Sequence, residues 1–130
     1  MLQLIEDSDS QHIKEMATYF DAELDEGNDA STITMNNAKA KGFISTYSLF
    51  AGLSVWVYNI NFGSDFNVDL GLSADRPYYF CYNVKGYYFH RFGEEGEFTK
   101  ILQNQNMIVR GNIETSVQIV FPANIKLEIA

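Results

Sequence analysis

Few side chains in this sequence of 130 residues are suited to metal binding or nucleophilic catalysis: two histidines, His12 and His90, and one cysteine, Cys81. A mononuclear metal site usually draws three or more histidine or carboxylate ligands from the protein. His90 stands in Phe-His-Arg-Phe with no second histidine beside it, and His12 falls in a segment with helical periodicity. The spacing therefore predicts no metal site and no cofactor. We expect His90 either to form a local hydrogen bond within a strand or to serve as a polar group in a ligand pocket.

The sequence also lacks the patterns expected for covalent catalysis or for catalysis by paired carboxylates. No Gly-x-Ser-x-Gly elbow or cysteine-protease signature surrounds Cys81. Glu94, Glu95 and Glu97 lie in a turn bracketed by glycines, where charges stay in contact with water. A single cysteine excludes an intrachain disulfide, and within the apolar run 78–82 we interpret it as a small buried side chain. We therefore predict no catalytic residues and a protein that is not an enzyme.

Aromatic residues are the strongest indication of a binding site. They crowd three runs with strand-like composition, 53–62, 78–84 and 87–92. Ligand pockets are lined by aromatic side chains and a few polar groups, and buried Tyr and Trp need hydrogen-bond partners, although core packing explains the same cluster. For a small organic effector, a sugar or another metabolite, the predicted ligand-binding residues are Trp56, Tyr58, Phe80, Tyr82, Tyr88 and His90. Arg91 and Arg110 are candidate counter-ions for an anionic ligand, and surface positions explain them as well.

The net charge of −8 is concentrated at the N-terminus. Residues 1–29 hold nine acidic side chains against Lys14 alone, so this segment carries the whole net charge and residues 30–130 are balanced. Neither part has the basic field that phosphate binding needs, so we expect no direct nucleic-acid binding by this chain. The acidic segment is either a solvated helix face or a surface that meets a basic partner domain.

The same composition predicts where the protein works. No stretch approaches the roughly 18 apolar residues needed to span a membrane. The first residues lack the basic and apolar regions of a secretory signal. We therefore expect a cytoplasmic protein with no membrane partner.

The acidic segment is predicted to contain one amphipathic helix over 10–26. Apolar residues recur there at spacings of three and four, and form a single stripe of Ile13, Met16, Ala17, Phe20 and Leu24. Ser8 is the expected N-cap, and Gly27 the expected stop signal.

After Gly27 the pattern changes to short β-rich runs separated by turn residues. The predicted strands are 31–35, 43–50, 53–62, 66–72, 78–84, 87–92, 98–102, 107–110, 116–121 and 125–129. Such spacing without intervening helices is typical of an all-β sandwich or barrel. We therefore predict an acidic N-terminal helix or arm over 1–29 and an all-β domain over 30–130. Run 53–62 is apolar on both faces, so its outer face needs a cover, which is the N-terminal helix, a second sheet or another subunit. We expect a homodimer whose two-fold contact is formed by the N-terminal helix or by this face.

Three stretches resemble a known family. They are the two apolar runs around Gly86 in 78–92, the run 52–58, and the closing pair 117–122 and 125–129. Together they are similar to the N-terminal cupin-like sensor and dimerisation domain of AraC-type bacterial transcription regulators. The resemblance implies a cupin-like jelly-roll barrel or sandwich that binds an effector and dimerises. It also implies a DNA-binding helix-turn-helix domain outside this chain.

Two other interpretations stay open. The first is a stand-alone small cupin-like protein that binds or converts a small metabolite. The second is a passive β-sandwich without a cavity.

Overall fold

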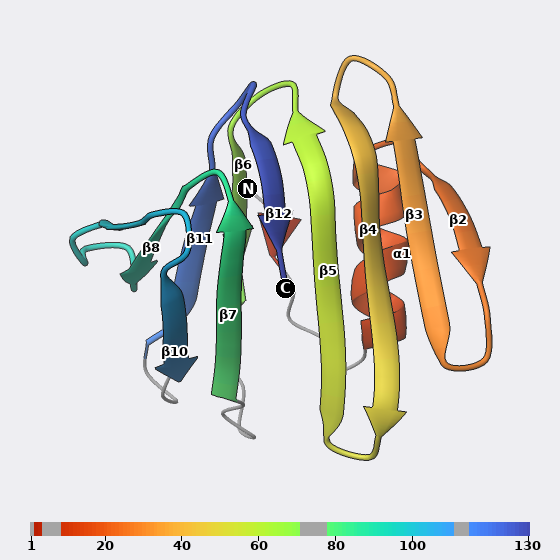
Figure 1. Cartoon of the computed structure of the whole chain (residues 1–130), viewed down its shortest axis with the longest axis horizontal. Coiled ribbons are helices and arrows are strands. Elements are labelled where there is room, and N and C mark those ends of the chain that lie inside the picture. Colours follow the sequence, from red (N-terminus) through yellow and green to blue (C-terminus); the bar gives the residue numbers. More distant parts are fainter. Residues whose placement is uncertain (1, 4–8, 71–77, 111–114) are drawn as a thin grey trace.

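The computed structural model describes residues 2–3, 9–70, 78–110 and 115–130, and most of these residues lie in two β-sheets (Figure 1). The smaller sheet has the strand order β1 (Leu2–Gln3), β6 (Phe66–Asp69), β11 (Val117–Phe121), β8 (Tyr88–Phe92) and β9 (Thr99–Ile101). The larger sheet has the order β10 (Asn106–Arg110), β7 (Tyr78–Lys85), β12 (Lys126–Ile129), β5 (Leu53–Phe62), β4 (Ala40–Phe50), β3 (Ala30–Asn36) and β2 (Glu23–Glu26).

The all-β prediction is confirmed. Each predicted run overlaps one of the strands β3 to β12, although the last two residues of run 66–72 lie outside the described residues. Neighbouring strands are antiparallel except for β1 and β6. Within the described ranges the two sheets stay open and form no closed barrel.

The core lies between the larger sheet on one side and the smaller sheet and helix α1 (Asp9–Tyr19) on the other (Figure 1). Alternate side chains along each strand point to this space. Phe20, the residue directly after α1, packs against Phe62 of β5 and Phe66 of β6, with ring centroids 5.4 and 4.8 Å apart. Phe121 of β11 adds a contact to Phe62 at 5.7 Å. These aromatic side chains join both sheets and the helix in one core.

The predicted helix 10–26 is wrong in its second half, because α1 ends at Tyr19. The backbone turns there in a Schellman motif: the Ala22 N–H donates to the Ala17 carbonyl at 2.9 Å, and the Asp21 N–H to the Thr18 carbonyl at 3.4 Å. Asp21 has φ 50°, the left-handed conformation of this motif. The C-terminal signal therefore lies at Asp21, although the sequence analysis expected it at Gly27.

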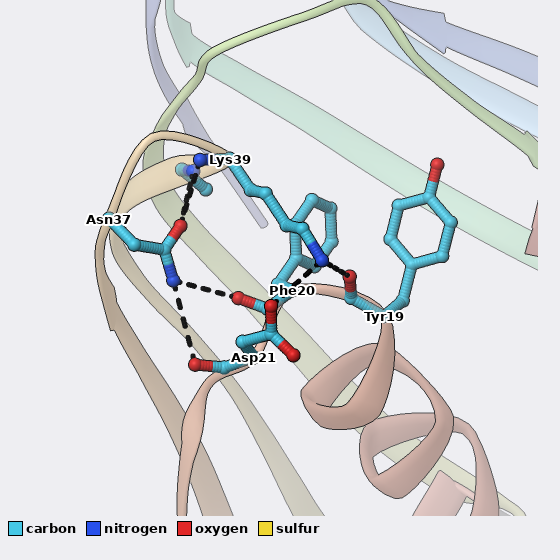
Figure 2. Close-up of polar contacts among 6 residues, drawn as sticks. Tyr19, Phe20, Asp21, Asn37 and Lys39 are labelled. Carbon is cyan, nitrogen blue, oxygen red and sulfur yellow. Dashed lines mark hydrogen bonds and ion pairs between the residues drawn. The ribbon is translucent and has the colours of Figure 1, made fainter.

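The hairpin between β3 and β4 completes this helix end (Figure 2). Asn37 Nδ2 donates to the Phe20 carbonyl at 2.8 Å, and Lys39 Nζ donates to the Tyr19 carbonyl at 3.3 Å. Lys39 also forms an ion pair of 2.8 Å with Asp21. Tertiary contacts thus satisfy carbonyls that the end of a helix leaves without partners.

Residues 23–26, predicted as helix, instead form β2, which pairs with β3 at the edge of the larger sheet. Leu24, which we assigned to the apolar stripe of the helix, is 36% exposed in this strand. The rest of the stripe is confirmed, because Ile13, Met16, Ala17 and Phe20 are all buried. The expected N-cap, Ser8, lies outside the described residues.

Candidate functional site

Four of the six predicted ligand-binding residues face the space between the sheets. Trp56 and Tyr58 share a face of β5 with the buried Ile60, and Tyr88 and His90 share a face of β8. The rings of Tyr58 and Tyr88 lie 5.5 and 5.7 Å from that of Phe121, so three strands bring them together.

The other two predicted residues, Phe80 and Tyr82, lie on the opposite face of the larger sheet. Both belong to β7, where Phe80 is 69% and Tyr82 is 53% exposed. Cys81 and Asn83, which alternate with them along the strand, point inward. The structure therefore divides the predicted cluster between the interior and an outer surface.

The interior is partly open to solvent around Trp56 and Tyr58. Both side chains are half-buried, as is Cys81 on β7, whereas Ile60 further along β5 is fully buried. Strand β12 pairs with residues 58–61 of β5.

Several polar groups in this interior lack a hydrogen-bond partner among the described residues. They include both ring nitrogens of His90, the Tyr88 hydroxyl and Asn83 Oδ1. The Asn83 amide nitrogen donates to the Gly86 carbonyl at 2.9 Å, so only its oxygen is unsatisfied. Each such buried group costs about 1–3 kcal/mol of stability. The local hydrogen bond that we considered for His90 is therefore not formed within the described ranges.

Burial keeps the ionisable groups of this interior uncharged at neutral pH. It raises the pKa of the Tyr58 and Tyr88 hydroxyls, and the negative charge that the nearby Cys81 acquires when it ionises adds to both effects. Burial also raises the pKa of the Cys81 thiol, an effect that the nearby Tyr88 hydroxyl opposes. Burial lowers the pKa of His90. The site therefore presents aromatic rings, hydroxyls and a neutral imidazole.

Neither candidate counter-ion reaches this interior. Arg91 lies on the far face of the smaller sheet, where its Nε donates to Gln118 Oε1 at 2.7 Å and its guanidinium stacks 4.4 Å from the Phe98 ring centroid. Arg110 lies on the outer face of the larger sheet, with its guanidinium 4.7 Å from the Tyr78 ring centroid. Both arginines therefore occupy surfaces outside the interior site.

Sequence reasoning missed a buried polar chain beside Arg91. Gln118 Nε2 donates to Asp69 Oδ2 at 3.4 Å, and Gln118 and Asp69 are 2% and 7% exposed. The chain joins β8, β11 and β6, whose residues are far apart in the sequence, so no local pattern signals it.

Sequence reasoning also missed a contiguous apolar surface, which we call the outer patch. It consists of Tyr78, Phe80, Tyr82, Val84 and Ile108, which are 43–69% exposed. Ile108 of β10 lies directly opposite Phe80 of β7. The sequence does contain a sign of this surface, because run 78–84 is apolar at nearly every position. A strand with this composition presents apolar side chains on both faces, so the face turned away from the core exposes them.

No three His, Cys, Asp or Glu side chains within the described ranges cluster closely enough to hold a metal ion. No helix in the described part of the chain has the length and apolar character to cross a membrane.

Comparison of the chain with protein-family models, with curated proteins and with solved structures finds no match.

Proposed function

We propose that the chain is an effector-sensing and dimerisation domain, with a small molecule bound between the two sheets. The observation that carries this proposal is the group of buried polar atoms of Tyr88, His90 and Asn83 without described partners. A hydroxylated ligand would satisfy these donors and acceptors, and Trp56 and Tyr58 offer rings against which it would stack.

The effector in this proposal is uncharged. The hydroxyls, thiol and imidazole of the interior are neutral because burial shifts each pKa against the charged form. An anion would lose its hydration there, and within the described ranges no arginine compensates for this, since Arg91 and Arg110 lie on other faces. A sugar or another neutral hydroxylated metabolite fits this chemistry.

The regulatory role rests on the resemblance to AraC-type regulators. In that proposal the two sheets are a cupin-like jelly roll, and the DNA-binding helix-turn-helix domain lies outside this chain. The domain works without a catalytic residue or cofactor. The effector binds one of two conformations more tightly and so shifts the population of the regulator.

Trp56, the single tryptophan, provides the experimental signal. Its fluorescence is to be followed during titration with neutral sugars and phenols, starting with D-glucose and catechol. A saturable change is expected for at least one neutral compound, and an unchanged signal throughout the panel counts against the site.

A further inference from the structure

A continuous row of side-chain rings runs through the interior from helix α1 to strand β8. Each ring centroid lies 5.5–6.4 Å from the next one in the row. In order, the rings belong to His12, Trp56, Tyr58, Phe121 and Tyr88. Trp56 and Tyr58, in the middle of the row, are stacked with 24° between their planes and are only half-buried. A ligand that reaches these two rings can therefore stack along the row.

The row begins at α1 with a histidine nitrogen that is buried. His12 Nε2 has no hydrogen-bond partner among the described residues, and the His12 ring lies 6.4 Å from that of Trp56. Thr46 of β4 stands directly opposite Trp56 in the pairing of β4 with β5, and it is 6% exposed. Its hydroxyl likewise has no partner within the described ranges. This end of the row therefore holds two polar atoms that a ligand would satisfy.

The end of the row at β8 has the same character. The Tyr88 hydroxyl, Asn83 Oδ1 and the His90 nitrogens there are the polar atoms on which the proposed function rests. Core packing accounts for the apolar rings between the two ends. It does not account for unsatisfied polar atoms at both ends, because each of them destabilises the folded chain.

We infer that the effector site extends along this row to α1, where His12 and Thr46 bind a second polar group of the effector. The inference rests on the proposed function, for which it specifies the ligand as a neutral glycoside of two rings. An imidazole nitrogen donates or accepts a hydrogen bond according to its tautomer, and a hydroxyl group does both, so a sugar hydroxyl suits His12. Three rings separate His12 from Tyr88, so a ligand with a single ring is expected to reach only one end.

The test is isothermal titration calorimetry of the full chain with matched compounds of one and two rings. D-Glucose is paired with cellobiose, and hydroquinone with its glucoside arbutin. In at least one pair the two-ring compound is expected to bind about tenfold or more tightly than its one-ring relative. His12→Phe keeps a ring beside Trp56 but removes the nitrogen. It is expected to weaken the two-ring compound about fivefold or more and to leave the one-ring compound unchanged.

Thr46→Val, which replaces the hydroxyl with a methyl group, is a second variant with the same expectation. Tyr19→Phe is the matched control, because it also removes one polar atom from α1 and keeps the ring. Tyr19 is the last residue of α1 and is 44% exposed. This control is expected to bind every compound as the wild type does. Circular dichroism checks that each variant is folded, and Thr46→Val decides the matter if His12→Phe does not fold.

The outcomes separate this inference from the proposed function. A wild type that binds none of the four compounds overturns both. A one-ring compound that binds as tightly as its two-ring relative overturns only the extension to α1. So does a His12→Phe variant that leaves the affinity for the two-ring compound unchanged, or that weakens both compounds equally.

Discussion

His90 brings two ring nitrogens into the space between the sheets, where neither finds a hydrogen-bond partner among the described residues. Its ring packs edge-on against Phe92, with centroids 4.8 Å apart. The side chain is 8% exposed, and burial lowers its pKa. Retaining a histidine at such a position costs stability, which is consistent with a role in ligand binding.

This burial predicts a specific pH dependence. Below the ordinary histidine pKa of about 6.5, the unfolded chain takes up a proton at His90 that the folded chain does not, so stability is lost as pH falls. His90→Phe removes both the unsatisfied nitrogens and this proton uptake. We expect the variant to be within about 1 kcal/mol of the wild type at pH 8 and to gain relative to it at pH 5. Urea unfolding of both proteins at the two pH values measures this difference.

The difference between the two proteins isolates His90, because their carboxylates are the same. A gap in unfolding free energy that is unchanged between pH 8 and pH 5 would contradict the description of His90 as a buried neutral group.

The sequence identified the residue types of the site but not the direction in which they point. Phe80 and Tyr82 were grouped with Tyr88 and His90, yet they lie on the opposite face of the larger sheet. Run 78–84 is apolar on both faces, so its pattern does not reveal which alternate residues are inside, and a shift of one residue reverses every side chain. The buried chain of Arg91, Gln118 and Asp69 depends on strand order, which local sequence does not encode.

At the scale of elements, the hairpin between β3 and β4 fixes where α1 ends. Asn37 has two tasks there: its Nδ2 donates to the Phe20 carbonyl, and its Oδ1 accepts from the Lys39 and Ala40 N–H groups at 2.8 and 3.2 Å. One side chain thus holds both the helix end and the turn of the hairpin.

Asn37→Ala is therefore expected to lower the free energy of unfolding by about 1–3 kcal/mol, since it leaves these groups without their partners. Its neighbour Asn36, an exposed residue of β3, provides the control. Asn36→Ala is expected to change stability by less than about 0.5 kcal/mol. Thermal or urea unfolding compares the two, and equal effects of both variants would refute the role given to Asn37.

Most of the strands were predictable, since turn residues separate runs rich in Val, Ile, Tyr and Phe. β2 was not, because Glu-Leu-Asp-Glu has low strand propensity and continues the helical spacing of Ile13, Met16 and Phe20. Pairing with β3 decides its conformation. The helix ends at Tyr19, where residues of the next hairpin contact the helix end, and a local reading of the sequence does not include these contacts.

At the scale of the whole molecule, net charge opposes the dimerisation that we propose for this domain. Two copies that each carry −8 repel one another. Because salt screens this repulsion while leaving apolar contact intact, raising ionic strength from about 0.01 to 0.5 M is expected to tighten the dimer several-fold. Sedimentation at both ionic strengths measures the change, and a dimer that dissociates as salt is added would show that ion pairs hold it instead.

The central claim is that an uncharged effector binds between the sheets and contacts His90. The measurement that tests it most directly is Trp56 fluorescence during titration of the wild type and His90→Phe. Neutral compounds are paired with anionic relatives: D-glucose with D-gluconate, and catechol with salicylate. The account predicts saturable binding of at least one neutral compound, at least tenfold weaker binding of its anionic relative, and a loss of about tenfold or more in His90→Phe. Tighter binding of the anion, or equal affinity of the wild type and His90→Phe, would contradict it.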